Sequence, residues 1–364
     1  MIKAIDFFSG AGGLTRGLLD AGVQVCAGVD LDGSLAQTYN DNNKPSIFLQ
    51  RDIKDVNIHL LRQRLGITDT DAVLYAACSP CQPFSTLNNK AQRRNEKSVA
   101  SEVVRRSLLL DFARVVEDCP PDFILVENVP GLGREEGKDV FDEFLRIIAT
   151  CGFAPENMFT GRLDAAYYGV PQVRKRFILL ASRHGAVQPP VKDKEQMKLK
   201  GQLERFTKIE AGQHDEKTLN HVTRPLAPHH RRIIESVPKN GGSRRDVKDT
   251  SILLKCHQDK PNVHKDVFGR MSWEKPSPTL TCRCTEVYCG RFTHPDQDRG
   301  ISQREAAAIQ TFPDDYKFYG NFTQISRQIG NAVPVNFAKR LGEAILKTNA
   351  SRHAHVYAPT LDLR

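Results

Sequence analysis

A cysteine in a rigid turn is the first residue of this sequence that could do chemistry. Ser79-Pro80-Cys81-Gln82 follows the apolar run 72–77, which is typical of a buried strand. Prolines at 80 and 83 stiffen the turn on both sides of the thiol. A thiolate at an electropositive site is an activated nucleophile, so Cys81 is a candidate catalytic residue. The alternative is a buried structural thiol, because free cysteine is among the most buried residue types.

An acid and an amide follow the next strand-like run in the same way. Glu127-Asn128-Val129 comes directly after the apolar run 123–126. The carboxyl ends of parallel strands meet at one edge of a sheet, where α/β proteins bind their ligands. We therefore expect Glu127 to share a crevice with Cys81 and to handle a proton or a hydrogen bond there. Capping a helix or pairing with an arginine is the alternative role for Glu127.

Two arginines are expected to form an anion site. In Gln172-Val173-Arg174-Lys175-Arg176 the long polar side chains alternate at the period of a strand, which predicts that Gln172, Arg174 and Arg176 project from one face. Two arginines on one face favour a phosphate or the carbonyl oxygen of a bound base.

A glycine turn near the start of the chain predicts a ligand that touches the backbone. Strand-like residues 3–8 lead into Ser9-Gly10-Ala11-Gly12-Gly13 and then into a helical pattern. The spacing is not GxGxxG, which disfavours a nicotinamide dinucleotide. Asp30 ends the next strand and suits ribose hydroxyls, while Asp52 suits an adenine amino group. A nucleoside ligand without a pyrophosphate fits best.

The elements that must position these residues alternate between strand and helix patterns. Strands are predicted at 23–29, 71–77, 122–126 and 176–182, and helices near 101–117 and 138–151. This alternation predicts an α/β fold with a doubly wound, mostly parallel sheet. Residues 184–277 are polar and predict a smaller, irregular second domain, and helical patterns at 302–310 and 334–346 return the chain to the first domain. The expected domains are 1–183, 184–277 and 278–364, with a loosely held tail from 348.

Composition limits the class of protein. The 364 residues carry a formal net charge of +9, which favours a polyanionic partner such as nucleic acid. No apolar stretch is long enough for a membrane span, and the N-terminus lacks the pattern of a signal peptide, so we expect a cytoplasmic protein with reduced thiols. Cys282, Cys284 and Cys289 lack paired zinc-ligand spacing and fit a strand better, so no metal is expected.

In this order, these motifs resemble the DNA (cytosine-5)-methyltransferase family. The resemblance covers nearly the whole chain and rests on six ordered segments. They are Asp6–Gly13, Ser79–Ser85, Glu127–Val129, Gln172–Arg176, Arg304–Ala307 with Gln310–Pro313, and Gln328–Pro334.

The resemblance implies a Rossmann-like fold that uses S-adenosylmethionine, with residues 184–277 as a target-recognition domain. It implies catalytic roles for Cys81, Glu127, Arg174 and Arg176, with Arg176 on the base oxygen and Arg174 on a phosphate. The cofactor-binding residues that it implies are Phe8, Gly10, Gly12, Asp30, Leu31, Asp52, Ile53, Pro80, Leu108, Asn331 and Val333.

The sequence departs from the family pattern at two places. The acid after the second strand is often a glutamate followed by an aromatic residue, whereas Asp30-Leu31 stands here, so Phe8 and Ile53 are expected to pack against the adenine. Ser79 and Cys78 stand where a glycine and a proline or phenylalanine are usual before the Pro-Cys pair.

The family also implies a reaction and its partners. Cys81 would add to C6 of a cytosine flipped out of duplex DNA, and C5 would then take the methyl group. Residues 85–101 are the expected clamp, and residues 229–232 and 241–245 are candidates for DNA contact. A cognate restriction endonuclease, a monomeric state and a location at the nucleoid are expected. The rival hypotheses are a transfer-RNA cytosine-5 methyltransferase, a catalytically silent DNA-binding protein and a nicotinamide-dependent oxidoreductase.

Overall fold

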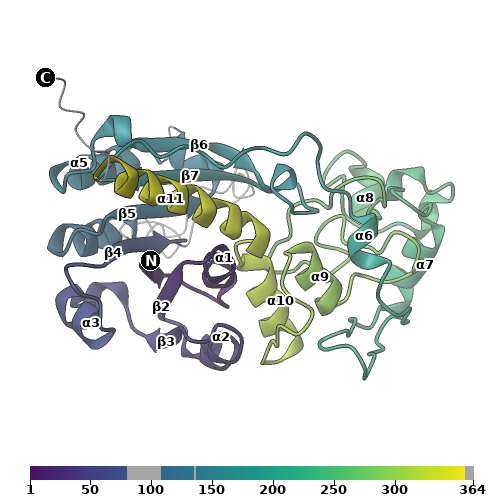
Figure 1. The fold of residues 1–364 in the computed structure, drawn as a ribbon. Helices are drawn as coiled ribbons and strands as arrows, with labels where there is room; N and C mark the ends of the chain where they lie inside the picture. Colours follow the sequence, from purple (N-terminus) through teal and green to yellow (C-terminus); the bar gives the residue numbers. More distant parts are fainter. Residues whose placement is uncertain (80–107, 135–136, 357–364) are drawn as a thin grey trace, which may run out of the picture. The chain divides into compact units, whose positions relative to one another are not determined.

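Two compact units make up the computed structural model, which describes residues 1–79, 108–134 and 137–356. Unit 1 comprises residues 1–163, 175–191 and 338–364, and unit 2 comprises residues 164–174 and 192–337. The chain path of both units can be followed in Figure 1. Residues 278–337 were expected to complete the first domain, but they lie in unit 2.

A seven-stranded sheet forms the centre of unit 1, with strand order β3-β2-β1-β4-β5-β7-β6 (Figure 1). The pairs β1–β2, β2–β3, β1–β4 and β4–β5 are parallel, which confirms the predicted doubly wound, mostly parallel sheet. β7 is antiparallel to β5, which the sequence analysis did not foresee, and β6 was not predicted. The strands are β1 Ile2–Phe7, β2 Gln24–Asp30, β3 Ile47–Gln50, β4 Ala72–Ala77, β5 Phe123–Asn128, β6 Met158–Asp164 and β7 Lys175–Ser182.

The helices of unit 1 follow the predicted alternation. The helix predicted near 101–117 is present over its described part, residues 108–118. The last helix, α11, runs from Val335 to Val356. The expectation of a loosely held tail from residue 348 was therefore wrong for residues 348–356, which are helical. The other helices are α1 Gly13–Ala21, α2 Ala36–Asn42, α3 Ile58–Arg64 and α5 Lys138–Thr150.

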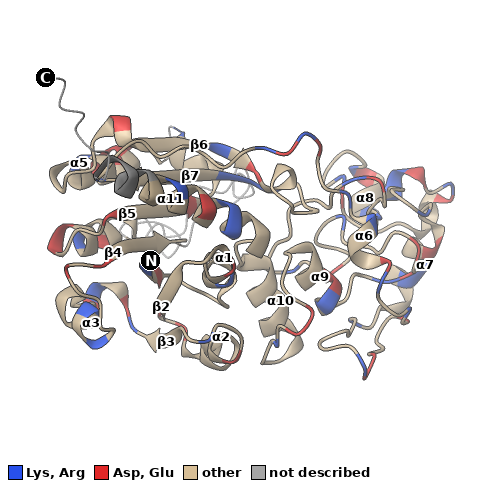
Figure 2. Ribbon diagram, viewed as in Figure 1, with Lys and Arg blue, Asp and Glu red and all other residues tan. Residues whose placement is uncertain are grey.

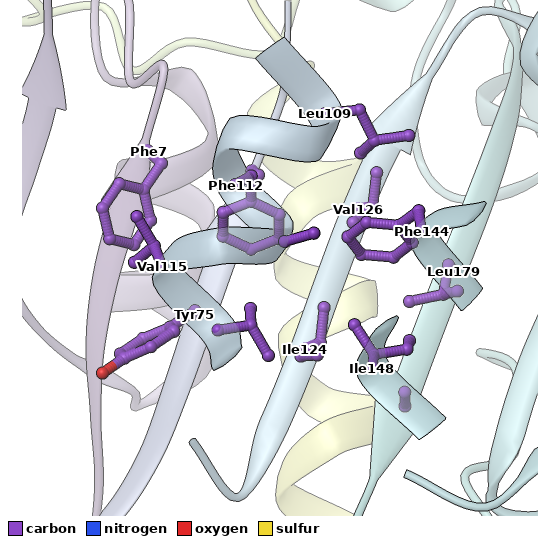
Figure 3. Close-up of a cluster of buried hydrophobic side chains, with 14 of the residues drawn as sticks. Phe7, Tyr75, Leu109, Phe112, Val115, Ile124, Val126, Phe144, Ile148 and Leu179 are labelled. Carbon is purple, nitrogen blue, oxygen red and sulfur yellow. The ribbon is translucent and has the colours of Figure 1, made fainter. Parts of the chain in front are cut away.

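The core of unit 1 lies between the sheet and the helices that cover it (Figure 3). Apolar residues such as Tyr75 and Ile124 come from the strands and meet Phe112 from the helical segment 108–118. The ring of Phe112 lies 5.5 Å from that of Phe7 and 6.1 Å from that of Phe144, between ring centroids. Strands buried on both faces read as continuous apolar runs, which explains why β4 and β5 could be predicted so closely.

Unit 2 is built from short helices joined by long loops. Ile233 and Ile234 of α7 pack against Phe268 and Val287 in its own apolar cluster. Cys282 to Thr285 form a turn and not the strand that the alternating thiols suggested, because Cys284 N donates to Thr281 O at 3.0 Å. The helices are α6 Lys200–Leu203, α7 Pro228–Ser236, α8 Lys255–Asp259, α9 Gln303–Ile309 and α10 Phe322–Asn331.

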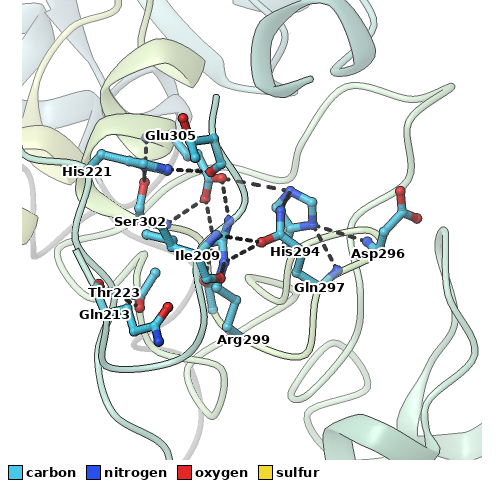
Figure 4. Close-up of polar contacts among 12 residues, drawn as sticks. Ile209, Gln213, His221, Thr223, His294, Asp296, Gln297, Arg299, Ser302 and Glu305 are labelled. Carbon is cyan, nitrogen blue, oxygen red and sulfur yellow. Dashed lines mark hydrogen bonds and ion pairs between the residues drawn. The ribbon is translucent and has the colours of Figure 1, made fainter. Parts of the chain in front are cut away.

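A buried ion pair fixes the start of α9 within unit 2 (Figure 4). Both guanidinium nitrogens of Arg299 lie 2.7 Å from the carboxylate oxygens of Glu305, and the two side chains are each 1% exposed. Ser302 N donates to Glu305 Oε2 at 2.7 Å, and Glu305 N donates to Ser302 Oγ at 3.0 Å, which completes a capping box. Burial raises the pKa of Glu305, but the charge and hydrogen bonds of Arg299 outweigh it and hold that pKa near 2. These contacts explain why α9 belongs to unit 2.

Among the described residues, no helix is both long and apolar enough to span a membrane. In the same residues, His, Cys, Asp and Glu side chains do not gather in a group of three or more that could hold a metal ion.

Candidate active site

Glu127 and Arg176 meet at the end of the sheet, as two of the predicted catalytic side chains. Arg176 Nε lies 2.9 Å from Glu127 Oε1, and the Glu127 side chain is 2% exposed. The antiparallel register pairs Glu127 with Ile178, which brings the start of β7 beside the end of β5. Pairing with an arginine was the expected structural alternative for Glu127. The location of Glu127 at the carboxyl end of β5 also suits a catalytic role.

The thiol of Cys78 contacts the same carboxylate. Cys78 was not among the expected site residues. Cys78 Sγ donates to Glu127 Oε2 at 2.9 Å. Cys78 directly follows β4, and β4 pairs with β5 up to Ala77 and Val126. The strand ends alone could have predicted this contact, because position 78 continues the register opposite Glu127.

Arg174 belongs to unit 2. Its guanidinium donates to the carbonyls of Leu280 at 3.2 Å, Gly330 at 3.4 Å and Ala332 at 3.0 Å, and the residue is 3% exposed. The expectation that Arg174 and Arg176 share one strand face was wrong, because β7 begins only at Lys175. These contacts indicate that Arg174 holds loops of unit 2 together. They disfavour the expected contact between Arg174 and a phosphate.

Cys81, Pro80 and the expected clamp 85–101 lie outside the described residues, so their roles stay predictions. Leu108, the first described residue after them, is half-buried and packs against the core of unit 1.

The glycine turn after β1 has a backbone shaped for close approach by a ligand. Phe8, Gly10 and Gly12 have φ angles of 59°, 55° and 88°, in the left-handed region. This conformation is unusual for a bulky residue such as Phe8 and concentrates at functional sites. A Cβ atom added at Gly10 would meet no heavy atom within 4 Å, so space is open beside the turn.

Asp30 holds this turn in place. Gly10 N donates to Asp30 Oδ2 at 2.9 Å, and Asp32 N donates to Asp30 Oδ1 at 3.0 Å. Burial raises the pKa of Asp30, which its two backbone donors partly offset. Asp30 is therefore a support of the turn as well as a candidate for binding ribose hydroxyls.

The residues after β2 and β3 offer apolar and polar surface near the same strand ends. Leu31 is 66% exposed, whereas Ile53 is only 4% exposed, so Leu31 presents more apolar surface than the residue expected to pack on an adenine. Asp52 Oδ1 accepts from Lys54 N at 3.0 Å and caps a short helical turn. The open space at Gly10, the left-handed backbone and the exposed Leu31 fit an adenosyl ligand.

Asn331 and Val333 belong to unit 2, at the end of α10. Gln310 Nε2 donates to the carbonyls of Ile329 at 2.6 Å and Ala332 at 3.1 Å, which fixes this segment. Asn331 is exposed and Val333 is buried. Their expected cofactor contacts stay predictions.

Asp6 is a buried acid next to the glycine turn. Thr15 Oγ1 donates to Asp6 Oδ2 at 2.7 Å and lies 2.9 Å from the hydroxyl of Tyr39. Burial raises the pKa of Asp6 to about 7, because the charged form loses its hydration.

Replacing Asp6 with asparagine should change how stability depends on pH. The folded protein holds the Asp6 proton up to about pH 7, whereas the unfolded chain releases it near pH 4. The native protein therefore loses stability as pH rises from about 4 to 7, by roughly 2–4 kcal/mol from this group. Urea unfolding at pH 5 and pH 8 should show a smaller loss in Asp6→Asn. Equal losses in the two proteins would contradict the assignment.

The candidates for DNA contact in unit 2 divide into exposed and buried residues. Lysine and arginine positions are marked on α7 and on the segments around α8 in Figure 2. Arg232 and Arg245 are exposed, whereas Arg244 is 1% exposed and donates to the carbonyls of Val263 and Pro261 at 2.5 and 3.4 Å. Arg244 therefore supports its loop and is not available to a phosphate.

Two relatives are similar to this chain over nearly its whole length. The Type II methylase M.HgiDII of Herpetosiphon aurantiacus is 33% identical over 352 residues, covering 94% of each chain. The Type II methyltransferase M.PspPI of Psychrobacter sp. (strain TA137) is 30% identical over 347 residues, covering 94% of this chain and 78% of that protein.

A solved structure has a similar fold. It is described as a DNA modification methyltransferase encoded within an E. coli prophage, and it superposes with a TM-score of 0.69 at 21% identity, covering 96% of this chain and 100% of the other. At that identity the likeness concerns the fold.

The model of one protein family spans almost the whole chain. The family described as C-5 cytosine-specific DNA methylase matches residues 2–347, a range that includes all of unit 2, unit 1 from residue 2 to residue 347, and all six ordered motifs. The chain therefore belongs to the C-5 cytosine-specific DNA methylase family.

Proposed function

We propose that this chain transfers a methyl group from S-adenosylmethionine to C5 of a flipped-out cytosine in a specific duplex DNA sequence. The observation that carries the proposal is the buried Glu127 carboxylate, held by Arg176 and Cys78 at the carboxyl end of β5. The family match and the Type II methyltransferase relatives support DNA as the substrate. S-adenosylmethionine, when bound, supplies an electrophilic methyl group.

In the proposed reaction Cys81 starts the chemistry. Its thiolate adds to C6 of the cytosine, and the electron pair of the C5–C6 double bond makes C5 nucleophilic. C5 would then take the methyl group as the bond between that methyl group and the cofactor sulfur breaks, which releases S-adenosylhomocysteine. C5 then loses its proton, and the electron pair left at C5 re-forms the C5–C6 double bond as the Cys81–C6 bond breaks. The covalent step turns an unreactive carbon into a nucleophile.

Glu127 and Arg176 are proposed to bind the base during this step. The carboxyl group of Glu127 suits both the exocyclic amine and N3: one oxygen accepts from the amine, and the other, when it carries a proton, gives that proton to N3, which neutralises the negative charge that develops when the thiolate adds. The guanidinium of Arg176 suits the carbonyl oxygen of the base. The 2.9 Å contact between Arg176 and Glu127 supports this shared role, because one site then offers an acceptor and a donor.

The turn after β1 is proposed to hold the cofactor. Phe8, Gly10 and Gly12 form its backbone, with Asp30 and Leu31 after β2 and Asp52 and Ile53 after β3. The left-handed backbone and the open space beside Gly10 support this assignment. Pro80, Leu108, Asn331 and Val333 complete the proposed set.

Duplex DNA is the proposed partner, read by unit 2. Flipping a base out of the duplex costs about a few kcal/mol, because the base loses its stacking and pairing. Contacts between the protein and the DNA must offset this cost. The net charge of +9 favours binding to phosphates. We expect a monomer at the nucleoid in the cytoplasm, because one flipped base needs one site, and a partner restriction endonuclease in a restriction-modification system.

Bisulfite sequencing tests the proposal directly. A mixed-sequence duplex is incubated with the protein and S-adenosylmethionine, with Cys81→Ser as the control. We expect cytosines at one short motif to resist conversion with the native protein and to convert fully with Cys81→Ser. Absence of methylation with the native protein would favour a transfer-RNA substrate or a silent DNA-binding protein.

A further inference from the structure

Two side chains just after β4 pair with two side chains at the end of β5. Cys78 Sγ donates to Glu127 Oε2 at 2.9 Å, and Asn128 Nδ2 donates to Ser79 Oγ at 3.1 Å. The backbone register of the two strands ends at Ala77 and Val126. The side chains therefore continue the pairing for two further positions, where Cys78 lies opposite Glu127 and Ser79 opposite Asn128.

The Asn128–Ser79 contact is buried, and the Cys78–Glu127 contact joins a half-buried thiol to a buried carboxylate. Ser79 is 3% exposed, and Glu127 and Asn128 are each 2% exposed. In such surroundings a hydrogen bond is stronger than in water, and an unpaired polar group is costly.

We propose that Cys78 and Ser79 are positioning residues for methyl transfer. Cys78 fixes the orientation of the Glu127 carboxylate, and Ser79 fixes the side chain of Asn128. The inference rests on the proposed function, because it requires Glu127 to act on the cytosine.

The geometry explains why two contacts are needed on one carboxylate. Arg176 Nε lies 2.9 Å from Oε1 and forms an ion pair with it, but Oε1 has no hydrogen-bond partner among the described residues, so the orientation of the carboxylate depends on a donor at its second oxygen. Cys78 supplies that donor at Oε2. A thiol is a weak donor, and a carboxylate oxygen has two lone pairs, so Oε2 can still accept a hydrogen bond from a base. The thiol thus orients the carboxylate without blocking it.

Substitutions of matched size test the role of the thiol. Cys78→Ala removes the donor, while Cys78→Ser replaces the thiol with a hydroxyl that can donate. Cys26→Ala, at a half-buried thiol on β2, serves as the control for loss of a cysteine in the same unit. Each protein is assayed for kcat, for KM toward DNA and S-adenosylmethionine, and for the rate of covalent trapping on a 5-fluorocytosine duplex.

We expect Cys78→Ala to lower kcat and the trapping rate about tenfold, as the loss of one oriented hydrogen bond would do, with both KM values within about twofold. Cys78→Ser should keep most of the native rate, and Cys26→Ala should keep all of it. An unchanged rate in Cys78→Ala, a rate in Cys78→Ser as low as in Cys78→Ala, or a rise in KM alone would overturn the proposal.

Ser79→Ala extends the test to a second position and covers the case in which Cys78→Ala does not fold. It removes the acceptor of Asn128, and we expect a similar fall in kcat and trapping at unchanged KM. A native rate in Ser79→Ala would overturn its assigned role. If the native protein itself gives neither methylation nor a trapped adduct, the proposed function fails, and that result is distinct from a defect confined to the variants.

Discussion

Replacing Glu127 with glutamine is expected to lower the rate of methyl transfer by about 1,000-fold or more. The carboxylate is buried; Oε1 forms an ion pair with Arg176, and Oε2 accepts a hydrogen bond from Cys78. Glutamine keeps the shape but has no proton to give to N3, so the negative charge that thiolate addition puts on the base is no longer neutralised. It also leaves the guanidinium of Arg176 beside a neutral amide. Single-turnover transfer of a radiolabelled methyl group to a duplex measures the effect.

A matched control separates this effect from a general loss of charge. Glu143 on α5 pairs with Arg146 at 2.6 Å on the surface of the same unit. Glu143→Gln should transfer methyl groups at the native rate, because an exposed pair of this kind contributes little. Glu127→Gln should still bind S-adenosylmethionine, as measured by calorimetry. A Glu127→Gln protein within about tenfold of the native rate would exclude Glu127 from the proposed role.

Replacing the buried Glu305 of unit 2 with alanine should lower the free energy of unfolding more than any other substitution proposed for this protein. Glu305→Ala leaves Arg299 without its partner, at a side chain that is 1% exposed. Breaking a buried pair in this way costs about 3–5 kcal/mol, because one uncompensated charge stays buried. The substitution also removes the acceptor of Ser302 N in the capping box of α9. Urea unfolding, followed with hydrogen exchange of α9, measures the loss.

A double substitution distinguishes the lost charge balance from lost packing. Replacing both partners with apolar residues, as in Arg299→Met with Glu305→Leu, removes both charges together. Such replacements are often close to neutral when the volume is kept, so the double variant should recover much of the stability that Glu305→Ala loses. A double variant less stable than Glu305→Ala would mean that the hydrogen bonds, and not the unpaired charge, dominate the cost.

The fold of unit 1 was largely predictable from local patterns. β4 and β5 are continuous apolar runs buried on both faces, and the glycine turn before α1 marks a strand-to-helix boundary. β6 was not foreseen, because its residues are half-buried or exposed and carry no strong apolar signal. The direction of β7 could not be predicted either, since a strand's own residues do not encode which way its neighbour runs.

The sequence by itself determined the mostly parallel sheet and the order of the motifs, and it placed Glu127 at the end of a strand and identified the glycine turn. Only the tertiary structure decided the partners of these residues. It brought Arg176 and Cys78 to Glu127, sent Arg174 to the carbonyls of unit 2, and showed that α9 is held by Arg299. The physical reason is range: strands and turns follow from neighbouring residues, whereas hydrogen bonds and buried ion pairs join residues that only folding brings together.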